Sequence, residues 1–293
     1  MITRKAIIVG FMGLLFQSFF CLAQTPDIFR AEYMMMPLNS SGSKLSRIKL
    51  VANYPIALKD SSNIIIGGEY NRLSYGLSRD GLPMEVEGFR HLHVADFNLA
   101  YVYRHNKYWR FIGVVTPRLS STLGDQIEKR DISFNATVGA FKEKKHVEKP
   151  FRLVLGIAYN ATVALRIPLP IVYYEKRFHK NWSYVVGAPK TAMKYHFNEK
   201  NMVQTEFILD GYYVNLQNSI GILGSGTATS ISSSAALATI GYQYSIKKSM
   251  FVYAYAGYTL FQTGVLRDED RNDIFTLNDD PSFYFRTGFR IGL

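Results

Sequence analysis

Cysteine is almost absent from this chain, which has a single one, Cys21, among 293 residues. Because that residue falls inside a predicted signal peptide, the mature chain is expected to have no disulfide, no thiolate nucleophile and no cysteine metal site. Tryptophan is also scarce, with two residues against 20 tyrosines and 20 phenylalanines. After residue 23 no segment approaches the roughly 18 apolar residues of a transmembrane helix, so that class is excluded for the mature chain.

The first 23 residues are typical of a secretory signal peptide. Arg4 and Lys5 form a short positive region, and residues 6–20 are an apolar run that ends near small residues suited to cleavage. A membrane anchor is the alternative, but the run is short for a spanning helix. We predict export through the inner membrane with a cleaved peptide over residues 1–23 and one mature domain over residues 24–293.

The formal net charge of +11 becomes +9 without this peptide, which has two basic residues and no acidic one. A basic chain can bind nucleic acid or an anionic surface. Export makes nucleic acid an improbable partner, and the densest basic segment, 142–149, is interrupted by glutamates. We therefore predict no nucleic-acid partner and expect the charges to lie along strands and turns.

Residues 283–293 alternate strictly between an apolar face and a face that carries Tyr284, Arg286 and Arg290. A period of two indicates a strand with two different sides. A strand that is apolar on one side up to the end of the chain suits a membrane barrel, with lipid outside and a polar lumen inside.

Similar segments recur between clusters of turn residues, and helical periodicity is weak. The fold class expected is all-β, a transmembrane antiparallel barrel of about 14 strands, with about 12 as the alternative. Two short strands, 182–187 and 191–197, are needed so that successive connections alternate between the two ends of the barrel. Short turns and both termini would then share the periplasmic side, and the long connections would face outward: 76–90, 120–130, 216–230 and 264–281.

Alternation also assigns side chains to the inner wall of this barrel. The lumen-facing candidates carry both signs of charge, with arginine in excess: Arg47, Lys49, Asp96, Arg104, Arg110, Arg118, Arg152, Glu206, Asp210, Arg286 and Arg290. Such a lumen can be a wet pore or can be closed by ion pairs, and the sequence leaves both open. An open pore would favour small anionic solutes. Trp109 and Trp182 follow short Lys/Asn turns, which predicts an aromatic girdle at the inner membrane edge.

No residue pattern indicates catalysis, a cofactor or a resident metal. His91 and His93 share one strand face and could bind a metal or exchange protons, but no third ligand is evident, so we interpret them as interfacial residues. The segment 264–281 is acidic, and a calcium site is conceivable there. It lacks the spacing of a calcium loop, and a solvated outer loop is the plainer interpretation.

The carboxyl-terminal octet resembles the signal that barrel-assembly machinery reads in outer-membrane β-barrel proteins of the Bacteroidota type. The matching positions are Arg286, Gly288, Ile291 and Leu293. Residues 182–213, with their break at Pro189, look like an uncharacterised outer-membrane barrel family known only as a domain of unknown function. The resemblance implies outer-membrane lipid, export machinery and barrel-assembly machinery as partners, and it implies no activity.

We therefore predict a monomeric, non-enzymatic outer-membrane barrel that is a passive small-solute channel or a structural barrel with external loops. Two alternatives stay open. One is a lipid-modifying enzyme at the barrel rim, and the other is a surface adhesion or binding protein that acts through its loops.

Overall fold

The computed structural model describes most of the chain, namely residues 27–59, 61–78, 82–145, 147–160 and 168–292. The predicted signal peptide, the predicted connection 161–166 and Leu293 of the predicted assembly signal lie outside these residues. No helix in the described part is long and apolar enough to cross a membrane.

The described residues form fifteen strands and two short 3-10 helices, η1 (Glu87–Phe89) and η2 (Lys129–Asp131). In chain order the strands are β1 (Asp27–Met36), β2 (Ser43–Ala57), β3 (Asn63–Leu77), β4 (His91–Arg104), β5 (Trp109–Ser121), β6 (Ile132–Lys144), β7 (Phe151–Asn160), β8 (Leu169–Arg177), β9 (Trp182–Ala188), β10 (Lys190–His196), β11 (Asn201–Ile222), β12 (Gly226–Lys247), β13 (Met250–Arg267), β14 (Asp273–Asn278) and β15 (Phe283–Gly292).

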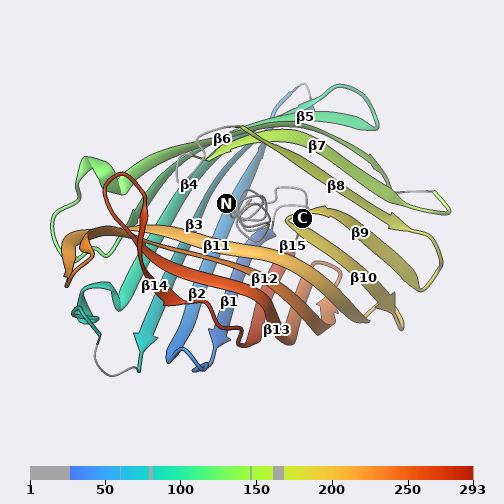
Figure 1. Ribbon diagram of the computed structural model, residues 1–293. Coiled ribbons are helices and arrows are strands. Elements are labelled where there is room, and N and C mark those ends of the chain that lie inside the picture. Colours follow the sequence, from blue (N-terminus) through green and yellow to red (C-terminus); the bar gives the residue numbers. More distant parts are fainter. Residues whose placement is uncertain (1–26, 60, 79–81, 146, 161–167, 293) are drawn as a thin grey trace, which may run out of the picture.

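These strands close into a barrel (Figure 1). Strands β1 to β13 pair in succession, and β15 pairs with both β13 and β1, so the ring has 14 antiparallel strands in the described chain. The predicted all-β barrel and its larger strand count are confirmed. Strand β14 was not predicted; it lies outside the ring and pairs only with the end of β13.

The two short strands around Pro189 exist as predicted. Trp182–Ala188 and Lys190–His196 pair as an antiparallel hairpin with Pro189 alone between them. Proline has no backbone N–H to donate to a strand ladder, so it suits the point where one strand ends and the next begins.

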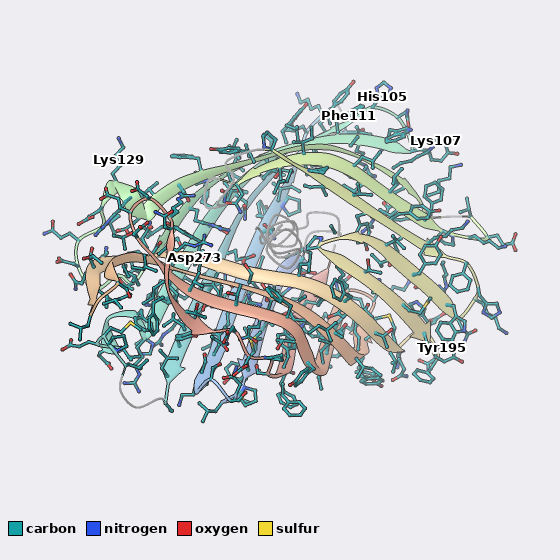
Figure 2. The ribbon with its side chains drawn as sticks, in the orientation of Figure 1. His105, Lys107, Phe111, Lys129, Tyr195 and Asp273 are labelled. Atoms are coloured by element: carbon teal, nitrogen blue, oxygen red, sulfur yellow. The ribbon has the colours of Figure 1, made fainter. Side chains whose placement is uncertain are left out.

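The barrel has two different ends. At the turn end, short connections join β2 to β3, β4 to β5, β6 to β7, β8 to β9, β10 to β11 and β12 to β13, and Asp27 and Gly292 pair there. Figure 2 shows His105, Lys107, Phe111 and Tyr195 of this end opposite Lys129 and Asp273 of the loop end. Short turns and both strand termini mark the turn end as periplasmic.

The predicted loop 216–230 is wrong, because most of it is strand. β11 runs to Ile222 and β12 begins at Gly226, so only three residues connect them. The Gly, Ser and Thr content suggested a loop, but Leu216, Ile220 and Ile231 are buried and supply the apolar face that strands at this position need.

An apolar core fills the loop end. It contains 19 buried side chains from β1 to β4, β11 to β15 and η1, and several are fully buried, including Phe89, Leu216, Leu237 and Leu277. β11 reaches across to β5, where Asn215 pairs in parallel with Ser121. The Thr122 amide donates to the Asn215 carbonyl at 3.2 Å, and the Ser120 hydroxyl donates to the Tyr213 carbonyl at 2.6 Å. The loop end of the lumen is therefore packed like a protein interior.

The outer wall is apolar, as a membrane barrel requires. Exposed side chains such as Phe97, Leu99, Val138 and Ile157 point away from the lumen on successive strands. Rings contact one another near the turn end; Tyr195, for example, lies 4.8 Å from Trp182 and 4.8 Å from Phe197 between ring centroids. This is the girdle that the tryptophan positions predict.

The seam between the first and last strands brings two cations face to face. Arg30 on β1 lies opposite Arg290 on β15. Asp27, which is almost fully buried, accepts a hydrogen bond from Arg30 at 2.6 Å and forms a 3.4 Å ion pair with Arg290. One carboxylate thus offsets the repulsion between both guanidinium groups.

Candidate functional site in the lumen

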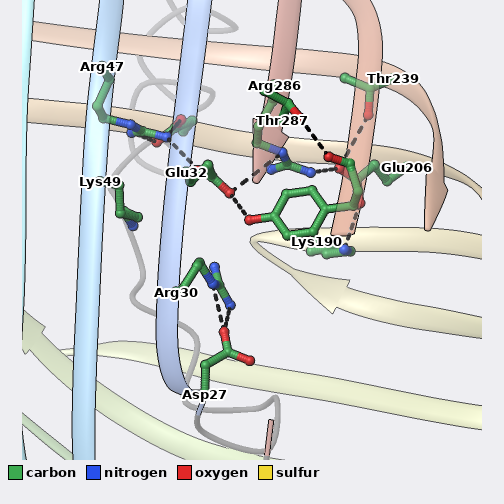
Figure 3. A network of polar contacts seen from close by, with 12 residues as sticks. Asp27, Arg30, Glu32, Arg47, Lys49, Lys190, Glu206, Thr239, Arg286 and Thr287 are labelled. Atoms are coloured by element: carbon green, nitrogen blue, oxygen red, sulfur yellow. Dashed lines mark hydrogen bonds and ion pairs between the residues drawn. The ribbon is translucent and has the colours of Figure 1, made fainter. Parts of the chain in front are cut away.

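A belt of buried ion pairs crosses the lumen below the apolar core (Figure 3). Arg286 on β15 approaches Glu206 on β11 at 2.5 Å and Glu32 on β1 at 3.9 Å. Arg47 on β2 contacts Asp210 on β11 at 3.1 Å and Glu32 at 3.8 Å. Since β12, β13 and β15 separate β11 from β1 in the ring, these contacts tie opposite walls together.

Further polar contacts hold this belt in place. Lys190 on β10 pairs with Glu206 at 2.6 Å, Thr239 donates to the same carboxylate at 3.2 Å, and the Tyr253 hydroxyl donates to Glu32 at 2.7 Å. Charges removed from water are costly unless they are paired and hydrogen-bonded. Each charged group of the belt has an oppositely charged partner, while the Nε atoms of Arg47 and Arg286 are buried without a hydrogen bond among the described residues. The pairing makes these residues structural parts of the lumen.

A second set of ion pairs lines the remaining wall. Arg118 on β5 donates twice to Asp96 on β4, at 2.6 and 2.8 Å, and both side chains are buried. Nearer the turn end, Glu143 on β6 pairs with Arg152 on β7. Lys49 contacts Glu69 at 2.9 Å, and Lys194 contacts Glu175 at 2.5 Å.

The charges in the lumen are balanced. In the described part of the chain each of nine cationic and eight anionic side chains takes part in at least one ion pair: Arg30, Arg47, Lys49, Arg118, Arg152, Lys190, Lys194, Arg286 and Arg290 with Asp27, Glu32, Glu69, Asp96, Glu143, Glu175, Glu206 and Asp210. The arginine excess that suggested an anion preference is nearly cancelled by these carboxylates.

A cavity of about 640 Å³ remains inside the barrel. Seven of the predicted lumen residues line it: Arg47, Lys49, Arg118, Arg152, Asp210, Arg286 and Arg290. Asp96 and Glu206 are buried behind Arg118 and Arg286. Arg110 pairs with Glu143 at 3.7 Å, and Arg104 is exposed at the turn end of β4.

Several charged residues of the lumen were missed by sequence reasoning. They lie on strands where alternation is short or irregular: Arg30, Glu32, Glu69, Glu175, Lys190 and Lys194. The strand period of two could have located them, because residues separated by an even number of positions on one strand face the same side. Each of these residues is so related to an inward residue of its own strand, except Lys190, which is placed by its pairing with β11.

In the described part of the chain the cavity extends to the upper edge of the short strands β9 and β10, a place that we call the wall notch. It lies between the loop end of β7 (158–160), the β9–β10 turn at Pro189, and residues 209–213 of β11. Successive residues of β11, with side chains on opposite faces, all line the cavity there. Among the described residues, no strand pairs with β11 on the β10 side between Leu209 and the contact with β5 at Tyr213.

Backbone pairing explains the notch. The β10–β11 ladder ends at Lys190 and Ile208, with one more bond from the Leu209 amide to the Pro189 carbonyl at 2.9 Å. β11 then leaves β10 for β5, which it meets at Tyr213 and Asn215. Seven-residue strands tilted by about 40° give a wall roughly 18 Å high, below the apolar band of about 25 Å.

The histidines do not form a metal or acid–base site. His91 is exposed, and the Nδ1 atom of His93 is hydrogen-bonded to the Tyr70 hydroxyl at 2.7 Å. His196 Nε2 lies 3.0 Å from the Ser183 hydroxyl, but that serine is buried and no described carboxylate contacts the other ring nitrogen. Among the described residues no group of three His, Cys, Asp or Glu side chains is placed to hold a metal ion.

The acidic segment 264–281 is partly ordered as strand. Arg267 and Asp273 pair at 2.7 Å across β13 and β14. In the turn between them, hydrogen bonds from the Asn272 side chain and amide hold the pKa of Asp268 below its usual range. The carboxylates of Asp268 and Asp273 thus contact other residues of the same segment and do not converge on one point.

The closed ring, the apolar outer wall and the charged interior make this protein an outer-membrane β-barrel. Residues 40–292 match DUF6268, a domain of unknown function. The chain belongs to the DUF6268 family. No curated protein matches this DUF6268 chain.

Solved structures of two porins and of LpxR resemble the DUF6268 barrel at low identity. A KdgM porin in complex with disordered oligogalacturonate is 7% identical, with a TM-score of 0.34 over 90% of this chain and 99% of that one. A NanC porin is 9% identical, with a TM-score of 0.37 over 90% and 98%. LpxR from Salmonella typhimurium is 10% identical, with a TM-score of 0.39 over 90% and 100%. At these values the likeness carries no argument about what the DUF6268 barrel does.

Proposed function

We propose that this barrel is a passive channel for small amphipathic solutes, which move between the lumen cavity and the membrane through the wall notch. The observation that carries the proposal is the combination of a loop end filled by buried apolar side chains with a cavity that reaches the wall between β7 and β11. Among the described residues, buried apolar side chains occupy the loop end, which disfavours the passage of water and ions there.

The lining of the notch favours a solute with both an apolar and a polar part. Tyr159, Leu209 and Tyr213 lie at the notch, and Asn160 and Asp210 lie beside them toward the lumen. Non-helical, unpaired backbone at membrane depth is tolerated where it lines a cavity. A low wall at β9 and β10 therefore suits lateral exchange with the outer leaflet.

The proposed function is non-enzymatic, and it treats the barrel as a monomer that contacts lipid on all sides. Assembly by the barrel machinery and the Bacteroidota-type attribution stay predictions that rest on the carboxyl-terminal octet. Small anionic solutes are not favoured, because the lumen cations are paired.

The test combines conductance with uptake. The refolded mature barrel, verified by heat-shifted gel mobility, is expected to give no discrete conductance steps in a planar bilayer. Cells that express it are expected to take up the amphipathic dye 1-N-phenylnaphthylamine faster than cells without it. Leu209→Trp, which fills the notch, is expected to remove most of this uptake.

Phe207→Trp is the matched control, since Phe207 is exposed on the outer face of β11 one pleat below Leu209. Its uptake should equal that of the wild type. Discrete conductance steps from the wild-type barrel, or equal uptake by Leu209→Trp and wild type, would contradict the lateral route and favour an open pore or a purely structural barrel.

A further inference from the structure

One region of the outer wall changes abruptly from apolar to basic. On β4 the outward side chains Tyr103, Tyr101, Leu99 and Phe97 are exposed apolar or aromatic groups, and the next outward rows include His93 and His91. On β3 the change lies between Tyr70 and Arg72, and on β2 between Ile48 and Lys44. Arg72 lies directly opposite His93, whereas on β2 the residue opposite Arg72 is still Ile48, and the basic Lys44 lies four positions nearer the loop end.

The register brings four cationic or ionisable side chains onto one surface, which we call the outer-wall basic patch: Lys44, Arg72, His91 and His93. Arg72 lies directly opposite His93 across β3 and β4. Lys44 lies opposite Gly76, and a Cβ atom on that glycine would come within 2.6 Å of the Lys44 side chain. The absence of a side chain at Gly76 thus lets the lysine lie across β3.

Hydrogen bonds orient the two histidines. The Tyr70 hydroxyl lies 2.7 Å from His93 Nδ1, and the Ser74 hydroxyl lies 3.4 Å from His91 Nδ1. Each ring therefore presents its Nε2 atom away from those bonds.

The basic charge of this patch has no acidic partner in the described part of the chain. Arg72 and Lys44 are exposed and form no ion pair with a described residue. In the loop that follows β3, Glu87 is paired with Arg90 at 3.3 Å. The nine described lumen cations named above, by contrast, each take part in an ion pair.

The height of the patch corresponds to the outer headgroup layer. Tyr103 and His93 are ten positions apart on β4, which is about 33 Å along a strand and about 25 Å along the membrane normal at a tilt near 40°. That equals the apolar band of such barrels. Tyr103 belongs to the turn end, so Arg72 and His93 lie where headgroups of the outer leaflet begin.

The neighbouring strands lack this feature. At similar positions β1 presents Met35 and β5 presents Leu119, both apolar. The patch is therefore confined to β2, β3 and β4, and the outward apolar residues on the turn-end side of its basic residues, Ile48, Tyr70 and Phe97, offer a surface for acyl chains.

We propose that the outer-wall basic patch binds a phosphate group of an outer-leaflet glycolipid. Arg72 has the planar donor geometry that matches phosphate oxygens, and Lys44 supplies a second charge. The lipid's acyl chains pack on the apolar row below. This site is independent of the wall notch, which lies between β7 and β11.

The experiment measures lipid retention by native mass spectrometry of the refolded mature barrel. The probes are bis-phosphorylated lipid A and the same lipid after removal of both phosphates. The wild type is expected to retain the phosphorylated form at least tenfold better. In the double variant Arg72→Gln/Lys44→Gln this preference should vanish, while retention of the dephosphorylated form stays the same.

Lys107→Gln/Lys129→Gln is the control, because it removes two exposed cations from the turn end and the loop end without touching the patch. It should keep the full preference. Equal retention of both lipids by the wild type would overturn the proposal, and so would an equal loss of preference in the control. It would also be overturned if millimolar inorganic phosphate displaced the bound lipid as well as micromolar lipid A does.

If the double variant fails to show heat-shifted mobility, Arg72→Lys replaces it. That variant keeps the charge but loses the paired donors of the guanidinium group, so an intermediate preference is expected. The lipid assignment would be overturned if the preference were unchanged and the wild type formed a dimer that the variant did not. That result would assign the patch to contact with a second copy of the chain.

Discussion

Replacing Glu206 by glutamine is expected to destabilise the barrel by about 3–5 kcal/mol, the cost of breaking a buried ion pair by removing one charge. The Glu206 side chain is fully buried and faces Arg286 at 2.5 Å and Lys190 at 2.6 Å. After the change both cations stay in the low-dielectric interior, where Arg286 keeps the 3.9 Å contact with Glu32 and its place over the Tyr255 ring. The glutamine amide still accepts one hydrogen bond, which places the expected cost within that range.

The assay is urea unfolding of the refolded barrel in lipid vesicles, followed by the fluorescence of Trp109 and Trp182. Arg90→Gln is the control, because it breaks the exposed Glu87–Arg90 pair and should cost less than about 1 kcal/mol. A double-mutant cycle with Arg286→Met should give a coupling energy of the order of 1–3 kcal/mol. A destabilisation of Glu206→Gln no larger than that of the control would refute the view that the belt holds opposite walls together.

Three further predictions follow from the same packing. Asp96→Asn is expected to destabilise the barrel by about 3 kcal/mol, since Arg118 loses a buried charged partner, and the same urea assay with Arg104→Gln as an exposed control checks it. Phe89→Ala is expected to cost about 3–5 kcal/mol and to admit small-ion conductance, because it removes a fully buried ring from the loop-end core; silent channels with wild-type stability would contradict this. Asn39→Ala removes side-chain bonds to Asn278 and to the Asp280 carbonyl, at 2.8 and 2.7 Å, so faster proteolysis of residues 268–282 is expected, and equal cleavage rates would count against the clamp.

The fold was predictable because the membrane imposes a period of two on every spanning strand. Over most of β2 and over residues 132–138 of β6 the alternation is clean, and the burial of the side chains follows it. The strand count depended on keeping two strands around Pro189, which the hairpin β9–β10 confirms.

The loop end was less predictable because its strands leave the membrane. Beyond Tyr213 the outer face of β11 no longer needs to be apolar, so Gln217 and Asn218 occur among buried leucine and isoleucine residues, and the pattern resembles a loop. The same relaxation conceals β14, whose Leu277 is buried in the core while Asp273 is exposed.

The lumen was predictable in its residue types but not in its connections. Parity alone placed Arg47, Arg286 and Glu206 on the inner wall, yet no local pattern indicates that β11 contacts β1, β2 and β15. Such contacts depend on how far the ring is flattened, which is a property of all fourteen strands together.

The carboxylate at the β1–β15 seam has a consequence for biogenesis. Arg30 and Arg290 face each other, so β15 brings a like charge against β1 when the ring closes. Asp27, at the start of β1, forms an ion pair with each guanidinium group. Closure of the ring is therefore favoured when β1 is in place down to Asp27, and the carboxylate favours this register of β1 and β15 over a shifted one.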